Sequence, residues 1–250
     1  MAYSFLRADC VIATIENLVF RVGERFPESG LKKVAEELAA TAKTCAAEAD
    51  RLSKPQRSIR AGVYAVWAFG AAAAGWVATG LHYDGFDWKA TSFVQVLEPA
   101  MNIAVLVGIG VLTLGRLEER YKRARALEYL HRLRSIAHVV DMHQLTKDPY
   151  KKSLMLPATA HSPKTPLSNA MLERYLDYCS ELAALTGKLA ALLAQSCKDG
   201  EVVAAASDVE ELTTGLSRKI WQKIMVIGRG DHDEFQAPQA RGRADVIINP

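Results

Sequence analysis

The chain has 250 residues, of which 50% are hydrophobic and 24% are charged, and its formal net charge is +3. This length fits one large domain or two small ones, and so small a net charge does not by itself indicate nucleic acid as a partner. None of the four cysteines belongs to a C-x-x-C pair, so the sequence predicts neither disulfides nor a zinc site. These cysteines are Cys10, Cys45, Cys179 and Cys197.

Residues 1–60 are predicted to form two amphipathic helices, which we expect to be cytoplasmic. The first covers residues 2–22, where apolar residues recur at three- and four-residue steps. Its predicted buried face is Phe5, Ile12, Ile15, Val19 and Val22. Pro27 and Gly30 end this helix, because both residues favour turns. The second helix covers residues 31–52, with an apolar face of Leu31, Val34, Leu38, Ala42 and Cys45.

Residues 61–115 contain two apolar runs, which predict a transmembrane helical hairpin. Residues 61–81 carry no charged side chain. A helix of that length rises about 30 Å, which is the thickness of the hydrocarbon core of a bilayer. Residues 93–115 carry a single charge, on Glu98. We therefore predict spans at 61–81 and 93–115, joined by an outer loop at 82–92.

Basic residues flank the predicted hairpin on both sides. They are Arg51, Lys54, Arg57, Arg60, Arg116, Arg120, Lys122, Arg123 and Arg125. The loop 82–92 contains one basic residue, Lys89, against Asp84 and Asp87. By the positive-inside rule, both termini are expected in the cytoplasm and the loop outside. The sequence thus predicts a multi-pass protein of the inner (plasma) membrane, with the lipid bilayer as its partner.

Polar side chains in the second run give candidates for a pore. Gln95, Glu98 and Asn102 are three and four residues apart and share one face of a helix. An ionisable residue inside a membrane helix indicates a functional site, and an oligomer with this face inward would place Glu98 in a pore. Alternatively, Glu98 extends toward the aqueous surface, or it precedes a helix that starts at Pro99. The sequence leaves these interpretations open.

Small residues in the first run predict close helix packing. Gly70 and Ala74, like Ala71 and Gly75, are four residues apart, and such pairs let helix backbones approach closely. We expect Gly70, Ala74 and Gly75 to pack against another helix, either within the hairpin or in a second copy. A homo-oligomer is the expected assembly.

Helices are also predicted after the membrane hairpin. Residues 116–149 read as one basic juxtamembrane helix, and residues 150–166 as a proline-containing linker. Residues 167–227 contain two apolar stripes and predict an antiparallel helical hairpin. The first stripe is Leu172, Tyr175, Leu176, Cys179, Leu182, Leu185, Leu189, Leu192 and Leu193, and the second is Val209, Leu212, Leu216, Ile220, Ile224 and Ile227. The tail 228–250 is expected to be largely disordered.

The basic helix carries the densest polar cluster, a ribbon of His131, Arg134, His138 and Asp141. At 100° per residue these side chains fall on one face. They offer too few ligands in one cluster for a typical metal site, so no metal is predicted. We expect instead a buried or interfacial ribbon in which Asp141 orients His138 and pairs with Arg134, because buried polar groups need partners.

Arg132 and His138 support a different interpretation. Their spacing fits an R-x(4–6)-H pattern, which resembles the catalytic motif of HEPN-type ribonucleases. In that family the arginine and histidine lie at a dimer interface and act on the RNA phosphate. The resemblance covers seven residues and implies a membrane-tethered ribonuclease as an alternative function.

The order of the predicted elements resembles that of SLATT-type two-span proteins. Those are predicted membrane effectors of bacterial defence systems, proposed to assemble into pores once triggered. The resemblance rests on the hairpin at 61–115 and the helix at 116–147, and it covers about residues 30–145. It implies a non-enzymatic protein that self-associates and perturbs the membrane under the control of its cytoplasmic helices.

Taken together, the sequence predicts an all-α membrane protein with a two-helix transmembrane hairpin and a cytoplasmic helical bundle. No phosphate-binding loop, dinucleotide fingerprint or hydrolase motif occurs in the sequence, so no cofactor is expected. Nucleic acid is not favoured as a partner, because no aromatic stacking platform is evident. A third interpretation is a structural scaffold that recruits a cytoplasmic protein partner.

Overall fold

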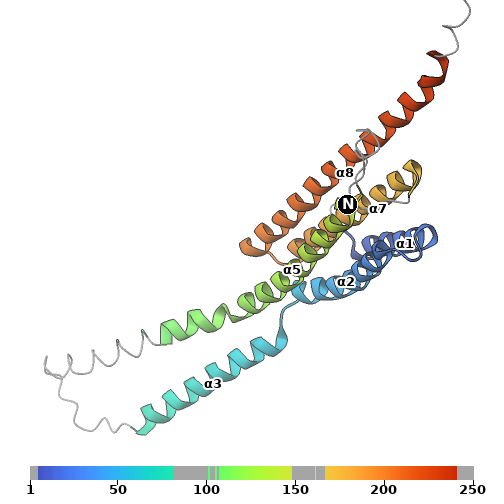
Figure 1. The fold of residues 1–250 in the computed structure, drawn as a ribbon. Helices are drawn as coiled ribbons and strands as arrows, with labels where there is room; N and C mark the ends of the chain where they lie inside the picture. Colours follow the sequence, from blue (N-terminus) through green and yellow to red (C-terminus); the bar gives the residue numbers. More distant parts are fainter. Residues whose placement is uncertain are drawn as a thin grey trace, which may run out of the picture. The chain divides into compact units, whose positions relative to one another are not determined.

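All the regular secondary structure that is described in this chain is helical. The computed structural model describes residues 5–80, 107–147 and 167–240, together with Met101, Val105 and His161. Within these residues the all-α prediction is confirmed (Figure 1). The helices are α1 (Ala8–Arg25), α2 (Gly30–Ser53), α3 (Arg57–Gly80), α5 (Leu117–Leu145), α7 (Asn169–Ser196) and α8 (Gly200–Ala240).

The chain divides into two compact units. The first contains Met1–Asp50 and Ala126–Pro250, and the second contains Arg51–Arg125. The first unit therefore holds α1, α7, α8, almost all of α2 and most of α5. The second holds α3 and the first residues of α5.

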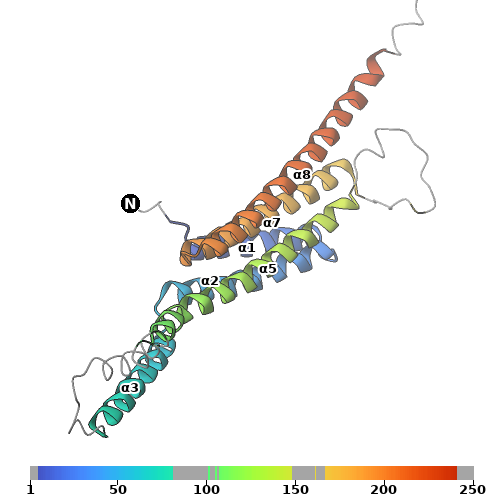
Figure 2. The same ribbon diagram turned by 90° about the vertical axis from the view of Figure 1, so that its left-hand side faces the viewer.

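The centre of the first unit is the antiparallel pair of α7 and α8, which makes the most extensive helix contact there. The two helices run side by side in both views, and α8 continues past α7 (Figure 2). All nine residues of the apolar stripe predicted on α7 are buried, and so are five of the six predicted on α8. Burying these side chains removes them from water and holds the pair together. The predicted hairpin is confirmed.

Side-chain caps set the start of three helices in this unit. The Ser168 hydroxyl accepts a hydrogen bond from the backbone N–H of Met171 at the start of α7 (3.3 Å). Asp199 accepts from the backbone N–H of Glu201 at the start of α8 (3.0 Å), and the Ser29 hydroxyl accepts from that of Lys32 at the start of α2 (3.2 Å). Each bond satisfies a backbone donor that has no partner within its helix.

The predicted buried face of α1 is wrong in part. Ile15 and Val22 are buried as expected, but Val11 and Leu18 take the remaining core positions. Phe5 is 73% exposed. Two neighbouring faces of this helix both carry apolar residues at helical spacing, so the periodicity alone did not select the correct one.

On α2 the predicted apolar face is confirmed, since every one of its five residues is buried. On α5 the side chains that enter the core of the first unit are Leu130, Leu133, Ala137 and Val140, together with Ala126, Tyr129 and Ile136. A bidentate ion pair between Arg21 and Glu181 (2.8 and 2.9 Å) further connects α1 to α7.

In the second unit, α3 begins four residues before the first predicted span and covers its residues 61–80. The second predicted span lies partly outside the described residues, but its residues 107–115 are helical. Across the residues that the structure describes, none of the helices combines the length and the apolar character needed to cross a membrane. The predicted loop 82–92 lies outside the described residues, as does the predicted linker 150–166 apart from His161.

The last helix is longer than the sequence suggested. We predicted that the helix would end near residue 227, but α8 continues through Ala240. A glycine inside a helix costs only about 1 kcal/mol relative to alanine, so Gly228 and Gly230 do not suffice to end it. The last ten residues of the predicted disordered tail lie outside the described part of the chain.

Candidate functional site

The most unusual surface of the second unit is that of α3, where apolar side chains are exposed on more than one side of the helix. Tyr64 is 70% exposed, Phe69 is 78% exposed and Trp76 is 82% exposed. The helical stretch 107–115 likewise exposes Ile109 and Leu112. Scattered apolar residues are normal on protein surfaces, but a contiguous apolar stretch of this kind marks a site that contacts protein or lipid.

An ion-pair cluster lies at the charged end of this apolar stretch. The two carboxylate oxygens of Glu118 accept hydrogen bonds from Arg60 Nε (2.7 Å) and from the backbone N–H of Gln56 (3.0 Å). Lys122 Nζ lies 3.1 Å from the same carboxylate. The bond from Arg60 contributes most to holding the Glu118 pKa down at about 2. Glu118 is therefore ionised at neutral pH and joins the start of α3 to the start of α5.

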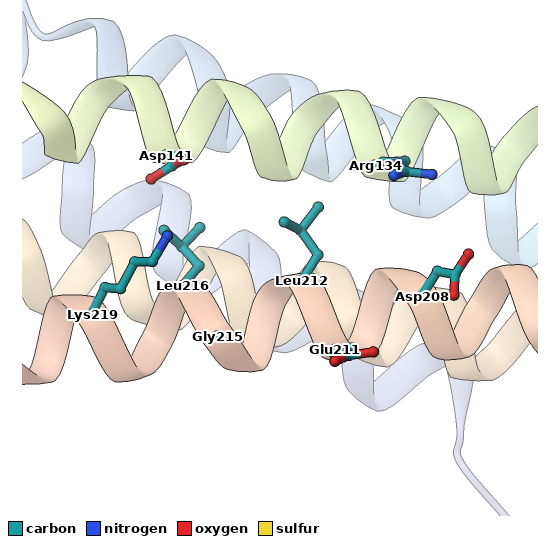
Figure 3. A pocket seen from close by; sticks show the side chains of 8 residues that line it. All are labelled: Arg134, Asp141, Asp208, Glu211, Leu212, Gly215, Leu216 and Lys219. Carbon is teal, nitrogen blue, oxygen red and sulfur yellow. The ribbon is translucent and has the colours of Figure 1, made fainter.

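A groove lies between α5 and α8 in the first unit. It encloses about 430 Å³ and combines charged walls with a leucine floor (Figure 3). It is lined by Arg134, Asp141, Asp208, Glu211, Leu212, Gly215, Leu216 and Lys219. Leu212 and Lys219 extend from α8 toward α5 (Figure 3). Its lining carries charges of both signs, with three carboxylates against two basic side chains, so the net charge of the lining is −1.

Asp141 is held in place by a hydrogen-bond chain that joins the two walls of the groove. Its Oδ1 accepts a hydrogen bond from Gln144 Nε2 (2.6 Å). Gln144 is 1% exposed, and both its side-chain and backbone oxygens accept from Lys223 Nζ (2.6 and 2.9 Å). These hydrogen bonds satisfy a buried amide, which would be costly to leave unpaired. They connect α5 to α8, so we assign them a structural role.

The four residues of the predicted polar ribbon do not form one hydrogen-bonded cluster in the described part of the chain. Arg134 and Asp141 line the groove, and His131 lines a smaller hollow beside it with Arg134 and Asp208. His138 is exposed. Asp141 bonds to Gln144 rather than to His138 or Arg134, so the predicted internal pairing is wrong. Because His131, Arg134 and His138 are exposed, water can hydrogen-bond to them and they need no partner within the protein.

The arginine and histidine of the HEPN-like pattern do not meet within one chain. Arg132 donates to the Glu128 carboxylate (2.8 Å) and stacks over the Tyr129 ring at 5.3 Å. At 100° per residue, Arg132 and His138 leave α5 about 120° apart. The two side chains therefore point to different sides of the helix.

A third site, which the sequence did not indicate, surrounds His143. Its Nδ1 lies 3.4 Å from the Tyr175 hydroxyl, and its ring lies against Gly30. The Lys147 ammonium sits 5.3 Å from the centre of the Tyr175 ring. Burial, and to a lesser extent the charge of Lys147, lowers the pKa of His143. The sequence feature connected with this contact is the glycine at position 30, because a larger residue there would collide with the histidine ring.

The remaining predicted site residues concern the hairpin. Gln95, Glu98 and Asn102 lie outside the described residues. Gly70 and Gly75 are described, and a Cβ added at either position would meet nothing within 4 Å in the described part of the chain. The side chain of Ala74 is not described. The predicted close packing is therefore not made by the described helices of a single copy.

Metal binding finds no support among the described residues, where no group of three or more His, Cys, Asp and Glu side chains is suitably placed. The buried thiols Cys45 and Cys179 each have a pKa raised to about 12, chiefly by burial, so they are poor nucleophiles and ligands. By its fold and surfaces, the chain is an all-helical protein with an exposed apolar helix. No known protein family, curated protein or solved structure matches it.

Proposed function

We propose that this chain is a non-enzymatic protein of the plasma membrane that crosses the bilayer twice and self-associates. Both termini lie in the cytoplasm, where the helices of the first unit control an activity of the membrane such as permeation. The observation that carries this proposal is the exposure of Tyr64, Phe69 and Trp76 on α3. These side chains belong to a stretch without charges, at 61–81.

Lipid is the partner that best explains such a surface. Each large apolar side chain loses about 1.5–3 kcal/mol of potential stabilisation when it stays in water. Lipid chains would cover apolar side chains that are exposed on several sides of α3, whereas a single partner helix would cover one side. The charged residues that bound the stretch, including Arg60 and Glu118, lie where a helix would leave the hydrocarbon.

Self-association is supported by the open positions on the same helix. Gly70 and Gly75 present backbone that another helix could approach closely, and nothing described in one copy occupies that space. A second copy is the simplest occupant, because it would present the same small residues at the same depth in the membrane. In such an oligomer, Gln95, Glu98 and Asn102 would be the candidates for facing a pore.

The experiment that tests membrane insertion compares two exposed phenylalanines. Phe69 lies near the middle of the proposed span and is 78% exposed, whereas Phe20 on α1 is 68% exposed and lies in the first unit. A lysine at the centre of a membrane helix costs about 3 kcal/mol. We expect Phe69→Lys to move the chain out of the alkali-resistant membrane fraction and Phe20→Lys to leave it there.

Two results would overturn the proposal. One is a wild-type chain that stays in solution without detergent and is released from membranes by alkaline carbonate. The other is equal membrane retention of the Phe69→Lys and Phe20→Lys variants.

Permeation is tested separately in liposomes that contain the purified chain. Glu98→Gln should change the rate or ion selectivity of leakage if Glu98 faces a pore. Unchanged leakage, together with a monomeric particle in detergent, would reject the pore. The alternative function, a membrane scaffold that recruits a cytoplasmic partner, would then be favoured.

A further inference from the structure

The positive charge of this protein is concentrated at the base of the proposed membrane hairpin. Residues 51–60 and 116–125 contain nine lysines and arginines against two glutamates, a net charge of +7. The whole chain has a net charge of +3, so the rest of the sequence carries −4. The positive charge is therefore a local property of these two segments, both of which belong to the second unit.

Not all of this charge is neutralised by the protein. Glu118 is already engaged by Arg60 and Lys122. Three exposed arginines, Arg57, Arg116 and Arg120, have no side-chain partner among the described residues. We call these three the collar arginines. An arginine that ends a membrane helix without a protein partner is free to bind an external anion.

We propose that the collar arginines bind the phosphate groups of anionic phospholipids in the cytoplasmic leaflet. This inference rests on the proposed membrane insertion, and it identifies anionic phospholipid as the ligand of the charged end of the hairpin. Each collar arginine lies within five residues, or about 8 Å, of a predicted span end, which is the depth of the lipid headgroups. The guanidinium group is suited to this ligand, because its planar donors match two oxygens of one phosphate.

The neighbours of the collar arginines favour lipid over RNA. Leu117 and Tyr121 are exposed beside Arg116 and Arg120, and they place apolar surface next to the charge. An apolar residue next to a guanidinium suits the boundary between headgroup and acyl chain. Sequence-independent binding of single-stranded RNA would instead need a row of aromatic stacking surfaces.

The expected effect follows from the surface potential of anionic membranes. Each basic residue near such a surface contributes about 1 kcal/mol, or about fivefold in affinity. Replacing all three collar arginines should therefore reduce the preference for anionic lipid by tenfold or more. Raising the salt concentration should reduce the wild-type preference in the same direction, because the interaction is screened.

The experiment measures lipid preference in the full-length chain. Wild-type protein and the triple variant Arg57→Gln/Arg116→Gln/Arg120→Gln are solubilised in a neutral detergent. Each is titrated with short-chain phosphatidylglycerol and, separately, with short-chain phosphatidylcholine. We expect wild type to bind phosphatidylglycerol more tightly and the triple variant to lose most of that difference.

A matched control removes the same charge elsewhere. Lys33, Lys198 and Arg218 are exposed, lie in the first unit and have no side-chain partner among the residues that the structure describes. The variant Lys33→Gln/Lys198→Gln/Arg218→Gln should keep the wild-type preference. Circular dichroism of each variant confirms that its helical content is unchanged.

Three results would overturn the collar inference. They are equal lipid preference of wild type and the triple variant, equal loss in the control variant, and displacement of phosphatidylglycerol by a short single-stranded RNA at comparable concentration. Alkaline extraction keeps this test separate from that of the proposed function. A wild-type chain retained in the membrane without lipid preference rejects the collar inference alone, whereas a chain released by alkali rejects the membrane proposal.

Discussion

Glu118 offers the sharpest test of how the second unit is held together. The substitution Glu118→Gln removes the negative charge but keeps the shape of the side chain. Its ion pairs with Arg60 and Lys122 would be lost, and the hydrogen bond from the backbone N–H of Gln56 would pass to a neutral acceptor. Glutamate and glutamine have similar helix propensities, so the loss of these pairs is the main effect on stability.

The size of the effect can be worked out from the pKa. A pKa of about 2 against an ordinary 4.5 corresponds to about 3 kcal/mol before screening by solvent is counted. The Glu118 side chain is 15% exposed and Arg60 is 55% exposed, so solvent screens the pair. We therefore expect a loss of about 1–2 kcal/mol in the free energy that holds α3 against α5.

The assay is amide hydrogen exchange of the full-length chain in detergent, read at the first turns of α3 and α5. Faster exchange by about five- to thirtyfold in Glu118→Gln would correspond to the expected loss. Glu119→Gln is the matched control, because Glu119 is exposed and has no side-chain partner in the described part of the chain. Equal exchange in the two variants would refute the reasoning.

The same contact predicts a dependence on pH. The folded-state pKa of Glu118 lies below its unfolded value, so the folded state binds its proton less readily. The stabilisation is therefore complete above pH 4.5 and is lost as the pH falls toward 2. In Glu118→Gln this part of the acid dependence should be absent, whereas Glu119→Gln should retain it.

Three further predictions concern the first unit. Gly30→Ala should lower its free energy of unfolding by about 1–3 kcal/mol, because the new Cβ would lie 2.4 Å from Cε1 of His143; thermal denaturation measures this, and an unchanged midpoint would contradict it. Gly187→Ala should destabilise by about 1–2 kcal/mol through its collision with the Thr213 hydroxyl, and a double-mutant cycle with Thr213→Ala should show coupling between the two sites rather than additive effects. The His143 pKa is lowered in the folded state, so its contribution to stability is complete above pH 6.5 and falls as the pH drops through the folded pKa; His143→Gln should flatten this dependence in urea titrations between pH 7.5 and 5.

Helical periodicity predicted most of the fold. The apolar stripes of α2 and α7 were identified residue by residue, because large apolar and polar side chains alternate clearly there. On α1 the choice between Val11 and Ile12 depended on which side the partner helices lie, and a single helix does not contain that information. The end of α8 was missed because glycines weaken a helix without reliably ending it.

Contacts between distant residues were beyond the reach of the sequence. Nothing in the sequence singles out Glu118, because its partners Gln56 and Arg60 lie about sixty residues away along the chain. The sequence predicted that Asp141 of the polar ribbon would pair with His138 and Arg134, but its partner in the structure is Gln144. A helical wheel shows which side chains share a face of a helix, but it does not show which face is exposed to solvent and which packs against other helices.

The bond from Lys223 to the backbone oxygen of Gln144 joins residues 79 positions apart. Gln144 is the next-to-last residue of α5, where carbonyl groups receive no N–H donor from their own helix and carry partial negative charge. Just beyond the helix, the backbone N–H of Lys147 also donates to this oxygen (3.1 Å). An ammonium group on α8 thus contributes a side-chain cap to the end of α5. The end of α5 is therefore stabilised in part by a segment synthesised much later, and we expect it to fray until α8 has folded against it.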